Sequence, residues 1–122
     1  DPVEALIREV LEETGLAVQI VQTGQSLDFK YPKQIPSPFT ILIENINDNS
    51  IGKHQHIDMI YFCILTDDQD GFADLNPGWF WVEKEHLDKG LPLKNHEGAL
   101  EPPPEDVLIL ASHAFKAVNL NT

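Results

Sequence analysis

The sequence predicts a single domain of the α/β class, and three observations support this prediction. A helical pattern opens the chain, several short apolar stretches typical of strands follow, and a second helical pattern closes it. This order favours a sheet whose faces are covered by helices. The length of 122 residues leaves room for one domain. Hydrophobic residues make up 42% and charged residues 23%, as in globular proteins, which argues against disorder or a fibrous repeat.

The first helix is predicted from its end signals and from its apolar spacing. Asp1 is a suitable N-cap, Pro2 fits the first helical position, and Glu4 stands where a capping box places its acid. Gly15 supplies the left-handed residue that ends a helix. The apolar residues between these signals recur at helical spacing: Val3, Leu6, Ile7, Val10 and Leu11.

Four strands are expected after this helix. Their ranges are residues 16–23, 39–46, 54–65 and 78–82. A loop with three prolines separates the first two, a turn-rich segment over 45–52 separates the next two, and an acidic loop over 67–74 precedes the last.

Two more helices are expected toward the C-terminus. A short one spans residues 83–89, and three prolines at 102–104 open the final one, with Glu105 and Asp106 near its positive end. The final helix has an apolar stripe made of Val107, Leu108, Ala111, Ala114, Phe115 and Val118.

The charge of the chain limits its partners. The formal net charge is −12, with 20 acidic against 8 basic residues, so nucleic-acid polymers and anionic membranes are poor partners. A small phosphate ester can still bind where divalent cations reverse the local sign. No apolar run approaches the roughly 20 residues that cross a bilayer. Cys63 is the one cysteine, which excludes an intramolecular disulfide and fits a reducing, cytoplasmic location.

The first helix carries an acidic face. Glu9, Glu12 and Glu13 fall within roughly 100 degrees of arc, with the small Ala5 at its centre. Their i,i+3 and i,i+4 spacings place like charges together, and Glu12 and Glu13 sit where the helix dipole prefers cations. Arg8 relieves only part of this repulsion. A divalent cation would balance it, since Mg²⁺ takes oxygen ligands and bridges carboxylates to phosphate. A solvated acidic face is the alternative.

The exact string decides between these interpretations. Residues 8–16 read REVLEETGL, which resembles the second half of the Nudix hydrolase box at each of its fixed positions. In that family the box reads Gly, five residues, Glu, seven residues, then Arg-Glu-aliphatic-any-Glu-Glu-any-Gly-aliphatic. Seven residues stand before Arg8, so the earlier Glu of the box would fall just before Asp1 and its Gly further upstream. We therefore expect a single Nudix-like domain over 1–122 that is truncated at its N-terminus.

The resemblance implies a fold and an activity. It implies an α/β/α sandwich with a mixed sheet, and Mg²⁺- or Mn²⁺-dependent hydrolysis of a nucleoside diphosphate linked to another group, by water attack at phosphorus. Glu9, Glu12 and Glu13 would be metal ligands and catalytic residues, with Glu9 also a candidate base. Arg8 would orient these acids, and Gly15 would end the helix.

The upstream half of the box bears on activity. In the family it supplies a Gly whose carbonyl helps to hold the metal, a Glu, and strands that complete the sheet. If the protein begins at Asp1, an exposed sheet edge or face predicts dimerisation, weak stability or no activity. The alternative function is then a catalytically silent Nudix-fold module that binds nucleotide or a partner. A homodimer is therefore among the expected partners, beside the small nucleoside diphosphate derivative.

Further residues are candidates for substrate binding. His54, His56 and Asp58 alternate along one strand and share a face, where they would line the substrate cleft. A zinc site of the His-any-His-any-Asp type and a plain polar strand face are the alternatives. Trp79 would line the cleft or stack on the base, as could Phe80, Trp81, Phe29 or Tyr31. The lysines nearest to these segments are candidate phosphate ligands: Lys30, Lys33 and Lys53. Four acids are candidates for an extra metal ligand outside the box: Asp70, Asp74, Glu83 and Glu97.

Overall fold

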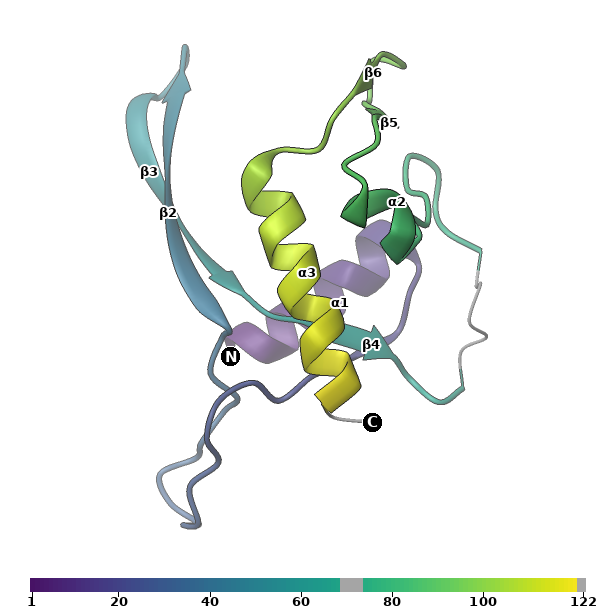
Figure 1. Ribbon diagram of the computed structural model, residues 1–122. Coiled ribbons are helices and arrows are strands. Elements are labelled where there is room, and N and C mark those ends of the chain that lie inside the picture. The colour runs from purple at the N-terminus through teal and green to yellow at the C-terminus, as the bar shows by residue number, and fades with distance from the viewer. Residues whose placement is uncertain (69–73, 121–122) are drawn as a thin grey trace.

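The computed structural model describes residues 1–68 and 74–120, and these combine helices with small antiparallel sheets (Figure 1). The α/β content predicted from the sequence is therefore confirmed. The elements in chain order are α1 (Pro2–Thr14), β1 (Val18–Ile20), β2 (Thr40–Asp48), β3 (Gly52–Ile60), β4 (Cys63–Leu65), α2 (Lys84–Asp88), β5 (Leu93–Lys94), β6 (Leu100–Glu101) and α3 (Glu105–Leu120).

Helix α1 has the end signals expected from the sequence. The Asp1 carboxylate accepts a hydrogen bond from the Glu4 backbone N–H at 2.9 Å, and the Glu4 side chain returns to the Asp1 nitrogen, which completes the capping box. Gly15 adopts the left-handed conformation with φ of 83°, and its N–H donates to the Leu11 carbonyl. Thr14 is the one residue of this helix that is buried.

The strands pair as three separate antiparallel ladders: β1 with β4, β2 with β3, and β5 with β6. The long hairpin of β2 and β3 stands apart from the helices along most of its length (Figure 1). Every strand pair in residues 1–68 and 74–120 is antiparallel, so a mixed sheet stays a prediction.

The expected strand over residues 54–65 is two strands with different partners. β3 pairs with β2 as far as Ile60, and β4 then pairs with β1 from Cys63. The break lies at Tyr61 and Phe62, where the Phe62 carbonyl accepts from the Val21 N–H at 2.8 Å and the Tyr61 hydroxyl donates to the Pro36 carbonyl. The chain thus changes partner at these two residues, which an uninterrupted apolar run does not reveal.

The prediction of a strand over residues 78–82 is wrong. Gly78 has φ of 93°, the Trp79 N–H donates back to the Asn76 carbonyl, and the segment pairs with no strand of the described chain. Trp79, Phe80 and Trp81 are each about half exposed. They are therefore not core residues, although their apolar character suggests that they would be. Conversely, the short pair of β5 and β6 was not expected.

The buried core is small. Leu16, Val18, Val21 and Phe62 are the buried hydrophobic residues of the described chain. The accessible surface is 9558 Å², whereas a folded monomer of 13.7 kDa exposes about 6,600 Å². The accessible surface of this chain is therefore about 3,000 Å² larger than that of an ordinary monomer of the same mass.

Helix α3 packs mainly through the apolar stripe predicted for it. Its stripe residues are partly buried except Val107, which is 45% exposed. The ring of His113 lies 5.2 Å from that of Phe39, which itself lies 4.6 Å from Phe62, and this stack links α3 to the core. α2 packs against α3, with the Lys84 ammonium 5.9 Å from the centre of the Phe115 ring. No helix in the described residues combines the length and apolar character needed to cross a bilayer.

Candidate functional site on helix α1

The acidic face of α1 is solvent-exposed and partly paired by Arg8. The Arg8 guanidinium lies 3.9 Å from a Glu9 carboxylate oxygen and 3.8 Å from one of Glu12. Glu9 and Glu12 are 61% and 65% exposed, and Glu13 is also exposed. Arg8 therefore bridges two of the three acids at distances longer than a hydrogen bond, and all three carboxylates remain open to a ligand.

The donor chemistry of this face fits a hard cation, although its side chains are not gathered around one point. Carboxylate oxygens are the ligands that Mg²⁺ takes, and exposed glutamates on one helix face can rotate toward a common ion. In residues 1–68 and 74–120, no three His, Cys, Asp or Glu side chains lie close enough together to hold a metal ion. Gathering Glu9, Glu12 and Glu13 would therefore require side-chain rotation.

Asn76 holds the C-terminal end of this helix. Its side-chain amide donates to the carbonyls of Glu12 at 3.3 Å and Glu13 at 3.2 Å, and its backbone N–H donates to that of Thr14 at 2.9 Å. The last carbonyls of a helix lack partners within it, so Asn76 satisfies three that would otherwise face only solvent. The sequence does not predict this role for Asn76, because no local pattern connects it to a helix more than 60 positions away.

A groove of about 390 Å³ runs between α1 and β3. The helix contributes Pro2, Ala5, Leu6 and Glu9, and the strand side contributes residues 57–61. Two sequence predictions meet here, because Glu9 from the acidic face and Asp58 from the candidate substrate face line the same groove. Ala5 lies in its lining, and a small residue at this position leaves room for a ligand beside the carboxylates.

A second hollow, of about 440 Å³, lies in the loop before β2 and contains Phe29, Lys30 and Lys33 in its lining. The Lys33 ammonium lies 3.0 Å from an Asp1 carboxylate oxygen and 3.8 Å from one of Glu4. These contacts join the loop to the first turn of α1. Lys33 therefore stands close to the helix end at which the groove begins. Tyr31 is 89% exposed and is not part of the lining of this hollow.

The other candidate residues lie elsewhere. His54 lines a hollow along the outer half of the β2–β3 hairpin together with Lys53, and Trp79 is an exposed loop residue. Asp74 precedes Asn76 by two positions, near the end of α1, while Glu83 is the N-cap of α2 and Glu97 lies in the β5–β6 turn. Asp70 lies outside the described residues.

Comparison with known proteins leaves the family open. No family model, curated protein or solved structure matches this chain.

Proposed function

We propose that this protein is a Nudix-type hydrolase that cleaves the acid anhydride bond of a nucleoside diphosphate derivative, with Mg²⁺ or Mn²⁺ as cofactor. One observation carries the proposal. Residues 8–16, which resemble the second half of the Nudix box, span the end of one well-capped helix and its left-handed glycine, and the first acid of that string lines a groove.

The roles follow from the positions on α1. Glu9, Glu12 and Glu13 would hold the cation, which would neutralise phosphate oxygens and assist the attacking water. Arg8 would orient Glu9 and Glu12 through the two ion pairs described above. Asn76 and Gly15 would fix the end of the helix and thereby the backbone positions of Glu12 and Glu13. Asp58, across the groove from Glu9, would contact the substrate or add an oxygen ligand.

The proposed substrate contacts lie in the hollow of the loop before β2. Lys30 offers positive charge in an otherwise strongly acidic protein, and Lys33 would do so by exchanging Asp1 and Glu4 for a phosphate. The half-exposed ring of Phe29 offers a stacking surface. A diphosphate held beside Glu9 could extend its nucleoside across the first turn of α1 toward this hollow. This arrangement suits a nucleoside triphosphate, a nucleotide sugar or ADP-ribose. Within the proposal, His54, His56 and Trp79 remain predicted substrate contacts with no geometric support.

The finer fold belongs to the same proposal. The three antiparallel ladders would be parts of an α/β/α sandwich with a mixed sheet, whose free strand edges are completed by further strands or by a second copy of the chain. Within residues 1–68 and 74–120, β2 and β3 pair only with each other, and this arrangement and the large exposed surface support the proposal. The half-buried single thiol of Cys63 suits a reducing, cytoplasmic compartment.

The test is metal-dependent turnover by the full chain. Phosphate or nucleoside monophosphate release is measured with Mg²⁺ or Mn²⁺ on a panel of the three substrate types named above. Glu12→Gln and Glu13→Gln should each reduce turnover about a hundredfold or more, since even residues behind metal ligands cost 10- to 100-fold in metal affinity or activity. Glu85→Gln, an exposed acid on α2, is the matched control and should leave turnover unchanged.

Stability separates loss of function from misfolding in this experiment. Glu13 repels Glu9 at i,i+4 and opposes the helix dipole, so Glu13→Gln should raise the free energy of unfolding by about 0.3–1 kcal/mol. Turnover and stability should thus move in opposite directions. Turnover that is independent of metal, or unchanged in both glutamate variants, would exclude the proposed site.

The alternative is a catalytically silent module that binds nucleotide or a partner. The separation of the three glutamates within the described structure favours it, because a metal cage is not already assembled. Such a module would bind nucleotide equally well with Mg²⁺ and with a chelator and would release no phosphate from any member of the panel.

A further inference from the structure

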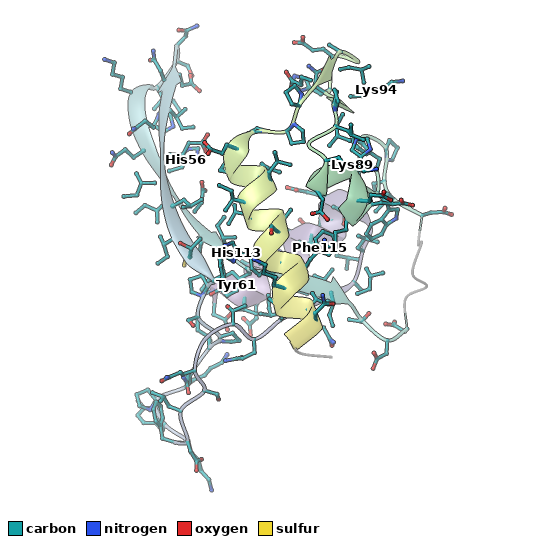
Figure 2. The ribbon with its side chains drawn as sticks, viewed as in Figure 1. His56, Tyr61, Lys89, Lys94, His113 and Phe115 are labelled. Carbon is teal, nitrogen blue, oxygen red and sulfur yellow. The ribbon has the colours of Figure 1, made fainter. Side chains whose placement is uncertain are left out.

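Two histidines on β3 are arranged as a pair of ligands. The Nε2 atoms of His54 and His56 lie 3.2 Å apart, and their ring centres lie 5.0 Å apart with planes inclined at 56°. They stand two positions apart on one strand, so they share a face of the hairpin. Figure 2 shows His56 on the side of the hairpin turned toward α3. Neither histidine is among the residues that line the groove beside Glu9, so the groove does not account for the arrangement of this pair.

The backbone fixes the tautomer of His54. Its Nδ1 lies 3.2 Å from the Gly52 carbonyl oxygen, which can only accept, so Nδ1 carries the proton. In the neutral ring, Nε2 then has no proton, and its lone pair accepts a hydrogen bond from the Nε2–H of His56. A metal-bound histidine usually donates its other ring N–H to a carboxylate or a backbone carbonyl, as Nδ1 of His54 does here.

The turn before β3, which precedes this carbonyl, has hydrogen bonds of its own. The Asp48 carboxylate accepts from both the backbone N–H of Ser50 at 2.7 Å and its hydroxyl at 2.6 Å. These bonds lower the pKa of the Asp48 carboxyl below its ordinary value, so the carboxylate that accepts them stays ionised to lower pH than an ordinary aspartate. Gly52, at φ of 87°, closes the turn directly before the histidines. His54 is therefore oriented before any ligand arrives.

We propose that His54 and His56 form a two-histidine chelate for a borderline transition-metal cation, of which Zn²⁺ and Cu²⁺ are the test ions. Two ligands bound at 2.0–2.1 Å around a tetrahedral ion are about 3.3 Å apart, close to the observed nitrogen separation. Binding needs His56 to move its proton from Nε2 to Nδ1, so both rings stay neutral and no proton is released overall. Imidazole is a preferred ligand of Zn²⁺ and Cu²⁺.

The surroundings favour a cation and leave room for further ligands. Glu44 lies directly opposite His56 in the β2–β3 register, and residues so paired have Cβ atoms about 4.5–5.5 Å apart. Its carboxylate could approach the ion after a side-chain rotation, and water would fill the remaining positions. His56 and Glu44 are exposed and His54 is half-buried, so an ion can enter from solvent. The inference rests on the hairpin alone and is independent of the proposed function.

The experiment titrates the full chain, without a histidine tag, with Zn²⁺ and separately with Cu²⁺. Calorimetry should show that the histidine pair binds one Zn²⁺ ion per chain. The affinity for this ion should fall at least about tenfold in His54→Gln and in His56→Gln, because a direct ligand matters at least as much as the residues that hydrogen-bond to ligands. His96→Gln is the matched control, since His96 is 90% exposed in another part of the chain, and it should bind like the wild type. Glu12→Gln should also leave the affinity of the histidine pair for Zn²⁺ unchanged.

Spectroscopy of the wild-type protein gives a readout that needs no variant. The electron paramagnetic resonance spectrum of the Cu²⁺ complex should show coupling to two imidazole nitrogens in the wild type and to one in either variant. Binding that survives His54→Gln/His56→Gln, that is lost in Glu12→Gln, or that shows no imidazole coupling would overturn the proposal.

Discussion

Replacing Gly15 by Ala tests how the acidic helix is ended, and the expected cost has two parts. Gly15 has φ of 83°, a region that costs an ordinary L-residue roughly 1–2 kcal/mol. A Cβ atom at this position would also lie 2.9 Å from the Oδ1 atom of Asn76. That atom ends a flexible side chain, so it can move, but only by giving up the bonds from the Asn76 amide to the carbonyls of Glu12 and Glu13.

The second part of the cost is therefore the loss of two hydrogen bonds. A typical intramolecular hydrogen bond contributes about 0.5–1.5 kcal/mol, and these two are long and partly exposed, so about 1 kcal/mol for both is appropriate. Gly15→Ala should destabilise the protein by about 2–3 kcal/mol in total. Such a change lowers the urea midpoint by about 1 M or more, since small proteins have slopes of about 1–3 kcal/mol per M.

Gly98→Ala is the matched control. Gly98 has nearly the same φ, 84°, yet a Cβ there would meet nothing within 4 Å, so it carries the conformational cost alone. The difference between the two variants measures the Asn76 contact. It should be near 1 kcal/mol and should vanish when both are compared in an Asn76→Ala background. Equal destabilisation by Gly15→Ala and Gly98→Ala in the wild type would refute the role given to Asn76.

Three further predictions concern burial and surface. Thr14→Val should destabilise the protein by about 1–3 kcal/mol in urea unfolding, because the threonine hydroxyl accepts from the buried Leu16 N–H and valine leaves that donor unpaired. Burial raises the pKa of the Cys63 thiol, so the unfolded thiol ionises first above about pH 8.5, and stability should fall from there toward higher pH. Cys63→Ala should remove that part of the slope between pH 7.5 and 9.5. Ile43 and Ile57 are 63% and 69% exposed on one face of the β2–β3 hairpin, and sedimentation should show a concentration-dependent dimer that Ile43→Lys and Ile57→Lys both weaken.

Local signals predicted the local structure. Asp1, Pro2, Glu4 and Gly15 act within a few residues of one another, so the limits of α1 could be derived from the sequence and are confirmed. The same holds for α2 and for the start of α3 after its three prolines. The candidate acids of α1 follow from helical spacing, and their common face depends on nothing outside the helix.

Pairings between distant segments could not be predicted from the sequence. Nothing near Tyr61 indicates that the chain leaves β2 for β1, because the cause is a bond from Val21, some 40 positions earlier. The aromatic run at 79–81 has the alternation of a strand, yet it belongs to no sheet within residues 1–68 and 74–120. The groove that Glu9 and Asp58 both line likewise depends on where α1 lies relative to β3, which only the folded chain establishes.

The way in which α1 ends bears directly on the proposed cation site. A helix C-terminus is usually stabilised by a basic side chain, and the last turn of α1 contains none. Its carbonyls are satisfied instead by the uncharged amide of Asn76 and by the turn at Gly15. A lysine in the place of Asn76 would serve the carbonyls equally well, but it would also neutralise Glu12 and Glu13. An uncharged cap adds no positive charge to this face beyond that of Arg8, and this favours a divalent cation at the proposed site.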